Sequence, residues 1–122
     1  MYAGTGDDRI NAAGGNDFVS AGIGNDTVFG GDGSDRLLGR NGDDELFGSL
    51  GADRIEGGVG KDMIFGGAGS DSIAGGHGDD ELYGEAGSDS IYAGPGLSLI
   101  HISEPTRRYA ISYAVFCLKK KK

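Results

Sequence analysis

The sequence predicts an all-β solenoid in which very short strands stack in parallel, and three observations lead to this prediction. A nine-residue unit recurs ten times in tandem over residues 3–92. Each unit repeats only one place that is always a branched aliphatic residue, which is too little apolar surface for an independent strand. Gly accounts for 26 of the 122 residues. This composition suits repeated tight turns and argues against the thick core of an ordinary globular enzyme.

Three places of the nine-residue unit are constant in all ten copies. The fourth place is Gly, the sixth is Asp, and the eighth is Ile, Val or Leu. A constant Gly indicates a positive φ or a backbone approach that leaves no room for a Cβ, so we expect the first six places to form a tight turn. The aliphatic residue at the eighth place predicts a three-residue strand with one inward side chain.

Two units per coil is the simplest way to close such a solenoid, because strands eighteen residues apart then pair with each other. This pairing predicts two inner rows of aliphatic side chains. One sheet would bury Ile10, Val28, Leu46, Ile64 and Leu82, and the other Val19, Leu37, Ile55, Ile73 and Ile91. These ten side chains would form the whole core.

The same pairing predicts two rows of aspartates along the turns. One row holds Asp8, Asp26, Asp44, Asp62 and Asp80, and the other holds Asp17, Asp35, Asp53, Asp71 and Asp89. Successive carboxylates would lie about one strand spacing, roughly 5 Å, apart. Bare carboxylates at this distance repel each other. We therefore expect these ten aspartates to be ligands of cations that lie between successive turns.

The residue types at the repeated places favour Ca²⁺ as this cation. They include no His and no Cys, and the only Cys of the chain is Cys117. Flexible sites made of oxygen atoms suit Ca²⁺ better than Zn²⁺ or Cu²⁺, and Mg²⁺ prefers to keep its waters. We expect the carbonyl oxygens of the second and fourth places to join the carboxylate. Five turns along each edge leave four gaps, which predicts about eight Ca²⁺ ions.

Charge divides the chain into two segments near Gly96. Residues 1–96 carry 18 acidic and five basic side chains, a net charge of −13, whereas residues 97–122 carry one acidic and six basic side chains. The acidic segment would repel nucleic acid and anionic membranes, and no apolar run is long enough to span a membrane. We predict one domain over residues 1–96, without nucleic-acid binding and without membrane insertion.

Residues 3–92 resemble the RTX, or haemolysin-type, calcium-binding nonapeptide repeat, whose GGxGxDxUx pattern they match throughout. The resemblance implies a right-handed parallel β-roll that is unfolded at low cytosolic calcium and folds outside the cell after type I secretion. It also implies that the sixth-place Asp is a side-chain ligand. Four second places depart from Gly, at Ala13, Arg40, Ser49 and Glu85. These departures are tolerable if the second place contributes only a carbonyl oxygen.

The predicted function is therefore a calcium-binding module of a secreted bacterial protein, with no catalysis of its own. His77 occupies a variable turn place, and no nucleophile stands at a matching place, so no catalytic residue is predicted. Two alternatives remain open. The module could belong to a secreted metalloprotease, lipase or epimerase whose catalytic domain lies outside this chain, or it could be part of an adhesin stalk.

Aromatic residues recur at the ninth place of alternate units, at Phe29, Phe47, Phe65 and Tyr83. Because they are eighteen residues apart, we expect them to stack on the outer face of one sheet. Such a row would stiffen the sheet by cross-strand contacts, or it would dock a neighbouring domain.

Residues 97–122 depart from the repeat. Ser98 stands at a place for Asp, and no Gly follows Gly96. Residues 97–107 and 111–122 resemble, codon for codon, a translated sequencing adapter followed by a run of A. We therefore expect a non-native tail that is disordered or arbitrary in structure, and we take the chain for a fragment of a larger protein.

Overall fold

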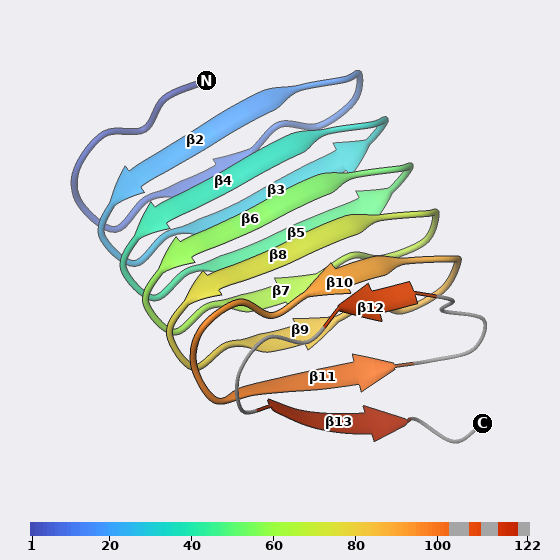
Figure 1. The fold of residues 1–122 in the computed structure, drawn as a ribbon. Helices are drawn as coiled ribbons and strands as arrows, with labels where there is room; N and C mark the ends of the chain where they lie inside the picture. The colour runs from blue at the N-terminus through green and yellow to red at the C-terminus, as the bar shows by residue number, and fades with distance from the viewer. Residues whose placement is uncertain (103–107, 111–114, 120–122) are drawn as a thin grey trace.

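The computed structural model describes residues 1–102, 108–110 and 115–119, and in it the chain winds into a solenoid with two sheets (Figure 1). The strands are β1 (Arg9–Asn11), β2 (Phe18–Ile23), β3 (Thr27–Asp32), β4 (Arg36–Asn41), β5 (Glu45–Leu50), β6 (Arg54–Val59), β7 (Met63–Phe65), β8 (Ser72–His77), β9 (Glu81–Tyr83), β10 (Ser90–Tyr92), β11 (Ser98–Ile102), β12 (Arg108–Ala110) and β13 (Val115–Lys119). The described residues contain no helix that is long and apolar enough to cross a membrane.

The odd-numbered and the even-numbered strands form separate sheets, as two units per coil require. The seven-stranded sheet has the order β1-β3-β5-β7-β9-β11-β13, and the six-stranded sheet has the order β12-β10-β8-β6-β4-β2. In Figure 1 the even-numbered strands lie in front of the odd-numbered ones. All the pairings between these strands are parallel. The predicted all-β solenoid of parallel strands is confirmed.

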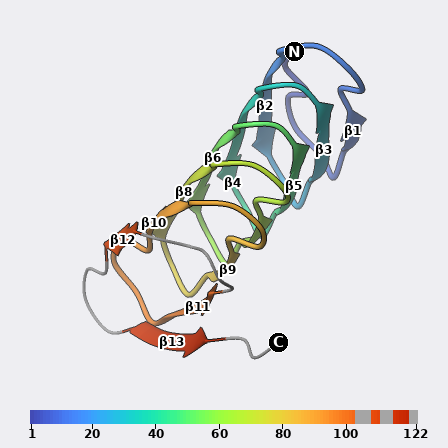
Figure 2. The same cartoon turned by 90° about the vertical axis from the view of Figure 1, so that its right-hand side faces the viewer.

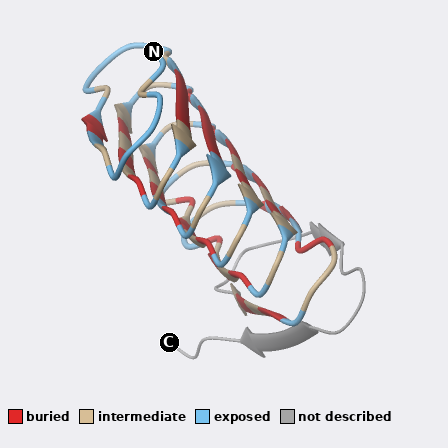
Figure 3. Cartoon of the chain, turned by 90° about the vertical axis from the view of Figure 1, so that its left-hand side faces the viewer, coloured by how far each residue is buried: buried red, intermediate tan, exposed pale blue. Residues whose placement is uncertain are grey.

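The core lies between the two sheets and contains the two predicted aliphatic rows; Ala21, Ala93 and Ile100 are also buried in it, so the ten predicted side chains are not the whole core. Ile10 pairs with Val28 on one sheet and Val19 with Leu37 on the other, and the eighteen-residue offset continues along both rows. The ten predicted core side chains are between 0% and 8% exposed. Figure 3 shows buried residues recurring in coil after coil along the roll. Burial of these side chains is the main apolar contribution to stability.

Six of the strands are longer than the three residues that the sequence predicts. Strands β2, β3, β4, β5, β6 and β8 each span six residues. The difference arises because the second and third places of the following unit also pair across coils, as Gly22 does with Arg40 and Ile23 with Asn41. The chain therefore stays extended beyond the aliphatic residue, and the turn is shorter than six places.

The constant Gly of the fourth place satisfies both reasons that the sequence suggested. From Gly6 to Gly87 these residues have φ between 98° and 128°, a region that side chains disfavour. A Cβ on Gly42 would also clash with the carbonyl oxygen of Gly24, one coil earlier. The second place has a positive φ as well, and the four non-Gly residues there are the described non-Gly residues with this conformation: Ala13, Arg40, Ser49 and Glu85.

The sheets continue beyond the last complete unit, at the end of the roll far from the N-terminus (Figure 2). Strand β11 pairs with β9, and Ile100 extends the inner row beside Leu82 with no exposed surface. This pairing follows from a signal that the sequence analysis did not use, because Gly94, Gly96 and Ile100 keep the second, fourth and eighth places of the repeat. The suggested non-native origin of residues 97–122 stays a prediction.

Candidate metal centre

The sixth-place aspartates line the interior of the roll at its two edges. All of those from Asp26 to Asp89 are 1% to 3% exposed, whereas Asp8 and Asp17 in the first coil are only partly buried. Their side chains point inward because they stand two residues before the inward aliphatic residue, and alternate residues of an extended chain face the same side. The structure thus brings the ten predicted site residues together in two rows.

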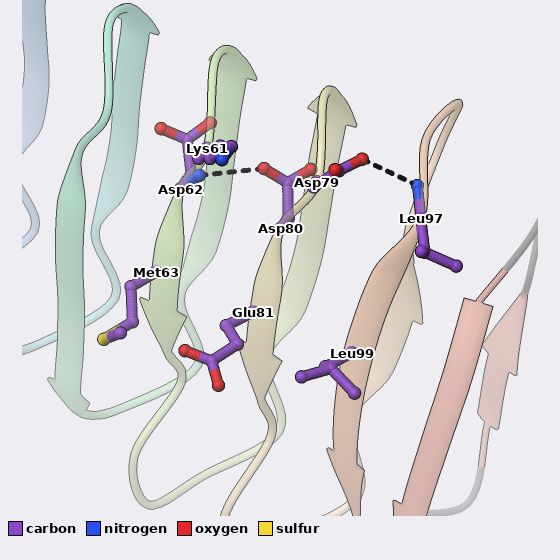
Figure 4. Close-up of a pocket in the computed structure, with 8 residues that line it drawn as sticks. All are labelled: Lys61, Asp62, Met63, Asp79, Asp80, Glu81, Leu97 and Leu99. Carbon is purple, nitrogen blue, oxygen red and sulfur yellow. Dashed lines mark hydrogen bonds between the residues drawn. The ribbon is translucent and has the colours of Figure 1, made fainter.

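In eight of the ten aspartates, from Asp26 to Asp89, one carboxylate oxygen accepts a hydrogen bond from the preceding coil. The backbone N–H of an aspartate donates a hydrogen bond to Oδ1 of the aspartate eighteen residues later, in eight pairs at 2.7–2.9 Å. Figure 4 shows this bond between Asp62 and Asp80. At the end of this row the N–H of Asp80 donates to Oγ of Ser98 instead, at 3.1 Å. The stacked carboxylates were expected to be bare, but a backbone N–H compensates one oxygen of most of them.

The other carboxylate oxygen is buried and has no hydrogen-bond partner among the described residues. This holds for Oδ2 of Asp8, Asp17, Asp26, Asp35, Asp44, Asp53, Asp62, Asp71 and Asp80. A buried carboxylate oxygen without a donor is costly unless a proton or a cation compensates it. The lack of a donor recurs in coil after coil, so it is a property of the repeat and not a local defect of packing.

A backbone carbonyl oxygen lies beside six of these carboxylate oxygens, from Asp35 to Asp80. A Cβ built on Gly48, at the first place of its unit, would lie 2.6 Å from Oδ2 of Asp53 and 2.7 Å from the carbonyl oxygen of Gly66 in the next coil. Equivalent contacts recur at Gly39, Gly57 and Gly75. Two acceptors therefore converge beside a glycine, and any side chain there would displace them.

These contacts change the expected set of carbonyl ligands. The second-place carbonyl oxygens of Gly4, Ala13 and Ser49 accept hydrogen bonds from backbone N–H groups of the next coil at 2.8–3.0 Å. The first-place carbonyl oxygen is instead the one beside the carboxylate. Sequence reasoning missed it, although the first place is Gly in each of the last seven units. The signal for this carbonyl ligand is a Gly that recurs at a place where the backbone has no positive φ, because such a Gly indicates that a side chain would have no room there.

Burial is the main cause of the raised pKa of these carboxyl groups. It raises the pKa of Asp53 and Asp62 to about 6, of Asp44 and Asp80 to about 7, and of Asp71 to about 8. The hydrogen bond from the preceding aspartate lowers each pKa, and the neighbouring negative charges raise it to a smaller extent. Desolvation, more than repulsion, is thus what a cation must overcome.

The donor set fits Ca²⁺. No three His, Cys, Asp or Glu side chains gather in the described ranges in a way that would hold a metal by themselves. An ion here must therefore combine single carboxylates with backbone carbonyl oxygens from successive coils, which is the all-oxygen environment that Ca²⁺ accepts. A pocket of about 320 Å³ lies beside Asp62 and Asp80 (Figure 4), although both aspartates are only 2% exposed.

Comparison with known proteins points to the same chemistry. A family model described as the RTX calcium-binding nonapeptide repeat matches the chain in four overlapping copies, at residues 2–37, 29–64, 38–73 and 65–97. These copies cover well over half of the chain. No curated protein matches the chain, and no solved structure matches it either.

Proposed function

The chain belongs to the RTX calcium-binding nonapeptide repeat family, and from this premise we propose that residues 1–96 are a module of a secreted bacterial protein that folds when Ca²⁺ binds outside the cell. The repeats of this family bind Ca²⁺ and are structural rather than catalytic. The module would leave the cell unfolded, by type I secretion, and the roll would form where calcium is abundant.

The orphaned Oδ2 atoms are the observation that carries this proposal. Each is buried with no donor among the described residues, and those from Asp35 to Asp80 lie beside a carbonyl oxygen of the next coil. Ca²⁺ supplies the positive charge that these acceptors lack. We assign the ten sixth-place aspartates as side-chain ligands, with the first-place carbonyl oxygens as their partners. Four gaps along each edge give about eight ions.

The same arrangement couples folding to calcium. Without a cation, the apo chain holds a net charge of −13 over residues 1–96 and only two narrow aliphatic rows, which is too little to overcome the conformational entropy of so many glycines. Because each coil contacts only its neighbours, binding at one gap orders the next, and folding becomes cooperative. Extracellular calcium modules bind at about 10⁻⁴–10⁻³ M, so the transition would lie between cytosolic and external calcium.

Circular dichroism of the full chain tests this coupling. In chelator we expect a coil spectrum, and with millimolar Ca²⁺ a strong β signal that Mg²⁺ reproduces only weakly. Titration calorimetry on the same samples should detect calcium binding. An ordered roll in chelator at about pH 8, where few of the aspartates are protonated, or no binding at millimolar calcium, would contradict the proposal.

Substitutions of Asp53 test the ligand assignment itself. Asp53→Asn keeps an oxygen that can accept the N–H of Asp35, at 2.8 Å in the structure, but removes the negative charge. Loss of a ligand should weaken calcium binding by at least about tenfold, since even outer-shell partners of metals are worth 10–100-fold. Asp8→Asn makes the same change at the terminal, partly buried aspartate of the other row and should cost much less. If Asp53→Asn binds calcium like the unchanged chain, the carboxylate is a structural acceptor and not a ligand.

A further inference from the structure

The outer face of the seven-stranded sheet carries a continuous stack of aromatic rings. Phe29, Phe47, Phe65 and Tyr83 lie on β3, β5, β7 and β9, which confirms the predicted row. Their ring centroids are 4.8, 4.9 and 4.5 Å apart, and successive ring planes are within 8° of parallel. We call these four residues the aromatic row.

The rings of the aromatic row show their edges, and not their faces, to the solvent. Each ring face is covered by the next ring, and the guanidinium of Arg9 lies over Phe29 with Cζ 5.1 Å from the ring centroid. All four side chains remain half-buried, so part of each ring is accessible. The edge of an aromatic ring carries the positive part of its quadrupole and attracts the π face of another ring. A flat aromatic molecule can therefore make such a contact at every ring along the row.

Carboxylates flank the aromatic row on the same face. Asp43, Glu45, Asp79 and Glu81 stand at the outward fifth and seventh places of the central coils, where Lys61 is the one base at these places; Arg9 lies at the end of the row in the first coil. Glu81 lies next to the row, because its Oε2 accepts a hydrogen bond from the hydroxyl of Tyr83 at 3.3 Å. Figure 4 shows Met63 and Glu81 side by side on neighbouring strands, at the rim of the pocket beside Asp79. The surroundings of the row therefore favour a positively charged ligand.

The outer face of the six-stranded sheet is different in both respects. Its ninth places hold Ser20, Leu38, Glu56, Ala74 and Tyr92, which form no aromatic stack. Its seventh places include Arg36 and Arg54, which pair with each other across strands. The two faces share the strand spacing but not the chemistry, so this second face serves as an internal control.

We propose that the aromatic row binds elongated, planar, aromatic cations, which lie along the axis of the roll with one flat face over the ring edges. An elongated ligand gains one edge-to-face contact for each ring it crosses, and its charge is held by the flanking carboxylates. The inference rests on the proposed function in one respect, because the row exists only in the folded roll. It concerns the outer face of the sheet, whereas the side chains of the predicted calcium ligands point into the roll.

Binding of thioflavin T, a rod-shaped planar cation, to the full chain in saturating Ca²⁺ tests this proposal. Fluorescence titration should show saturable binding to chain that light scattering shows to be monomeric, and circular dichroism of each sample should show the folded roll. The double variant Phe47→Leu/Phe65→Leu keeps apolar side chains but interrupts the row, and it should weaken binding by about tenfold. The control Tyr92→Leu, an aromatic-to-leucine change at the ninth place of the other sheet, should change affinity by less than about twofold.

The charge of the ligand is tested by Glu45→Gln, which should weaken binding by about twofold and reduce its dependence on salt. A planar anionic dye of similar length should bind more weakly than thioflavin T. This inference is overturned if the folded roll binds the dye equally well with and without the rings of Phe47 and Phe65. It is also overturned if the folded roll does not bind the dye, as expected of a face that docks only a protein domain. Either result leaves the calcium proposal intact. If circular dichroism shows no β signal in calcium, the calcium proposal is overturned, and the proposal about the aromatic row fails with it.

Discussion

The aliphatic rows and the aspartate rows occupy the same interior and stand only two places apart in each unit, yet they have opposite energetics. Ile55 has no exposed surface and gains free energy from burial, at about 25 cal/mol per Å² of apolar area. Asp53 is 2% exposed, and burial raises its pKa to about 6 because the charged form loses its solvation. The aliphatic rows therefore stabilise the roll under all conditions, whereas the aspartate rows do so only when their charge is compensated.

We expect pH to have the largest effect that distinguishes the two kinds of row. It should change the stability of the metal-free roll strongly, because it acts on many aspartates together. The raised pKa values, from about 6 to about 8 against an ordinary 3.8, mean that the folded chain binds more protons than the unfolded chain in this interval. Stability from these groups is therefore present at low pH and is lost as pH rises through about 6–8. In chelator, circular dichroism should show more β structure at about pH 5 than at about pH 8.

Calcium should reverse this dependence. The ion needs the deprotonated carboxylates, so the calcium concentration at the folding midpoint should rise as pH falls, and binding should release protons. The aliphatic rows carry no titratable group and cannot produce either trend. A β signal in chelator that does not change with pH would show that the aspartates are already compensated in the metal-free chain.

Shortening an aliphatic side chain should be the next largest effect. Ile55→Ala leaves a cavity in the middle of its row and should cost about 2–5 kcal/mol of unfolding free energy in saturating calcium, measured by urea denaturation. Val59→Ala is the matched control, because Val59 is 54% exposed, and it should cost less than about 0.5 kcal/mol. Similar losses for the two variants would mean that the aliphatic row is not the core.

Adding a methyl group beside the aspartate row should have a smaller effect that depends on calcium. In Gly48→Ala the Cβ would meet Oδ2 of Asp53 and the carbonyl oxygen of Gly66 at distances below 3.0 Å, so these atoms must move apart. Such overpacking costs about 1–3 kcal/mol, and we expect the loss to appear as a weaker response to calcium. Gly14→Ala, with no atom within 4 Å of its Cβ and no positive φ, should behave like the unchanged chain.

The smallest effect is expected where the unit departs from Gly at its second place. Ser49 has a φ of 80°, which Gly adopts without strain. Ser49→Gly should raise the unfolding free energy in calcium by up to about 1 kcal/mol, because relief of this strain is partly offset by the greater entropy of the unfolded chain. A clear destabilisation would mean that the Ser49 side chain has a role beyond occupying a turn.

The strand pairings and the rows of side chains could be predicted from the sequence, because they depend only on the eighteen-residue offset between coils. The pairing of Val28 with Leu46, the gathering of the aspartates and the stack of Phe47 on Phe65 all follow from one period and one alternation of side chains. In the candidate site, the identity of the aspartates was predicted, but their hydrogen bonds were not. The N–H to which each Oδ1 binds belongs to another coil, and a pattern of residue types does not specify backbone orientation.

Two further differences have physical causes that the period cannot express. The strands are longer because the backbone pairs across coils at places where the side chains give no apolar signal, as at Gly22 and Arg40. The sheets continue through β11 because the open edge of a parallel sheet offers unpaired N–H and C=O groups to any segment with an aliphatic residue at the eighth place, here Ile100. Residue types thus fixed which side chains meet, and backbone hydrogen bonding determined how far each element extends.

The hydrogen bonds between aspartates also give the roll a direction. From Asp26 onwards each carboxylate accepts an N–H from the coil before it, so the backbone donor of one coil is satisfied by the coil that follows, as Asp62 is by Asp80. Shortening the roll from its C-terminal side would therefore leave a buried backbone N–H without its acceptor, whereas shortening it from the other side would leave only a carboxylate oxygen without its donor, as at Asp8 and Asp17 in the partly buried first coil. Designed arrays of these units would accordingly require a terminating acceptor at one end only, and Ser98 shows that a hydroxyl suffices.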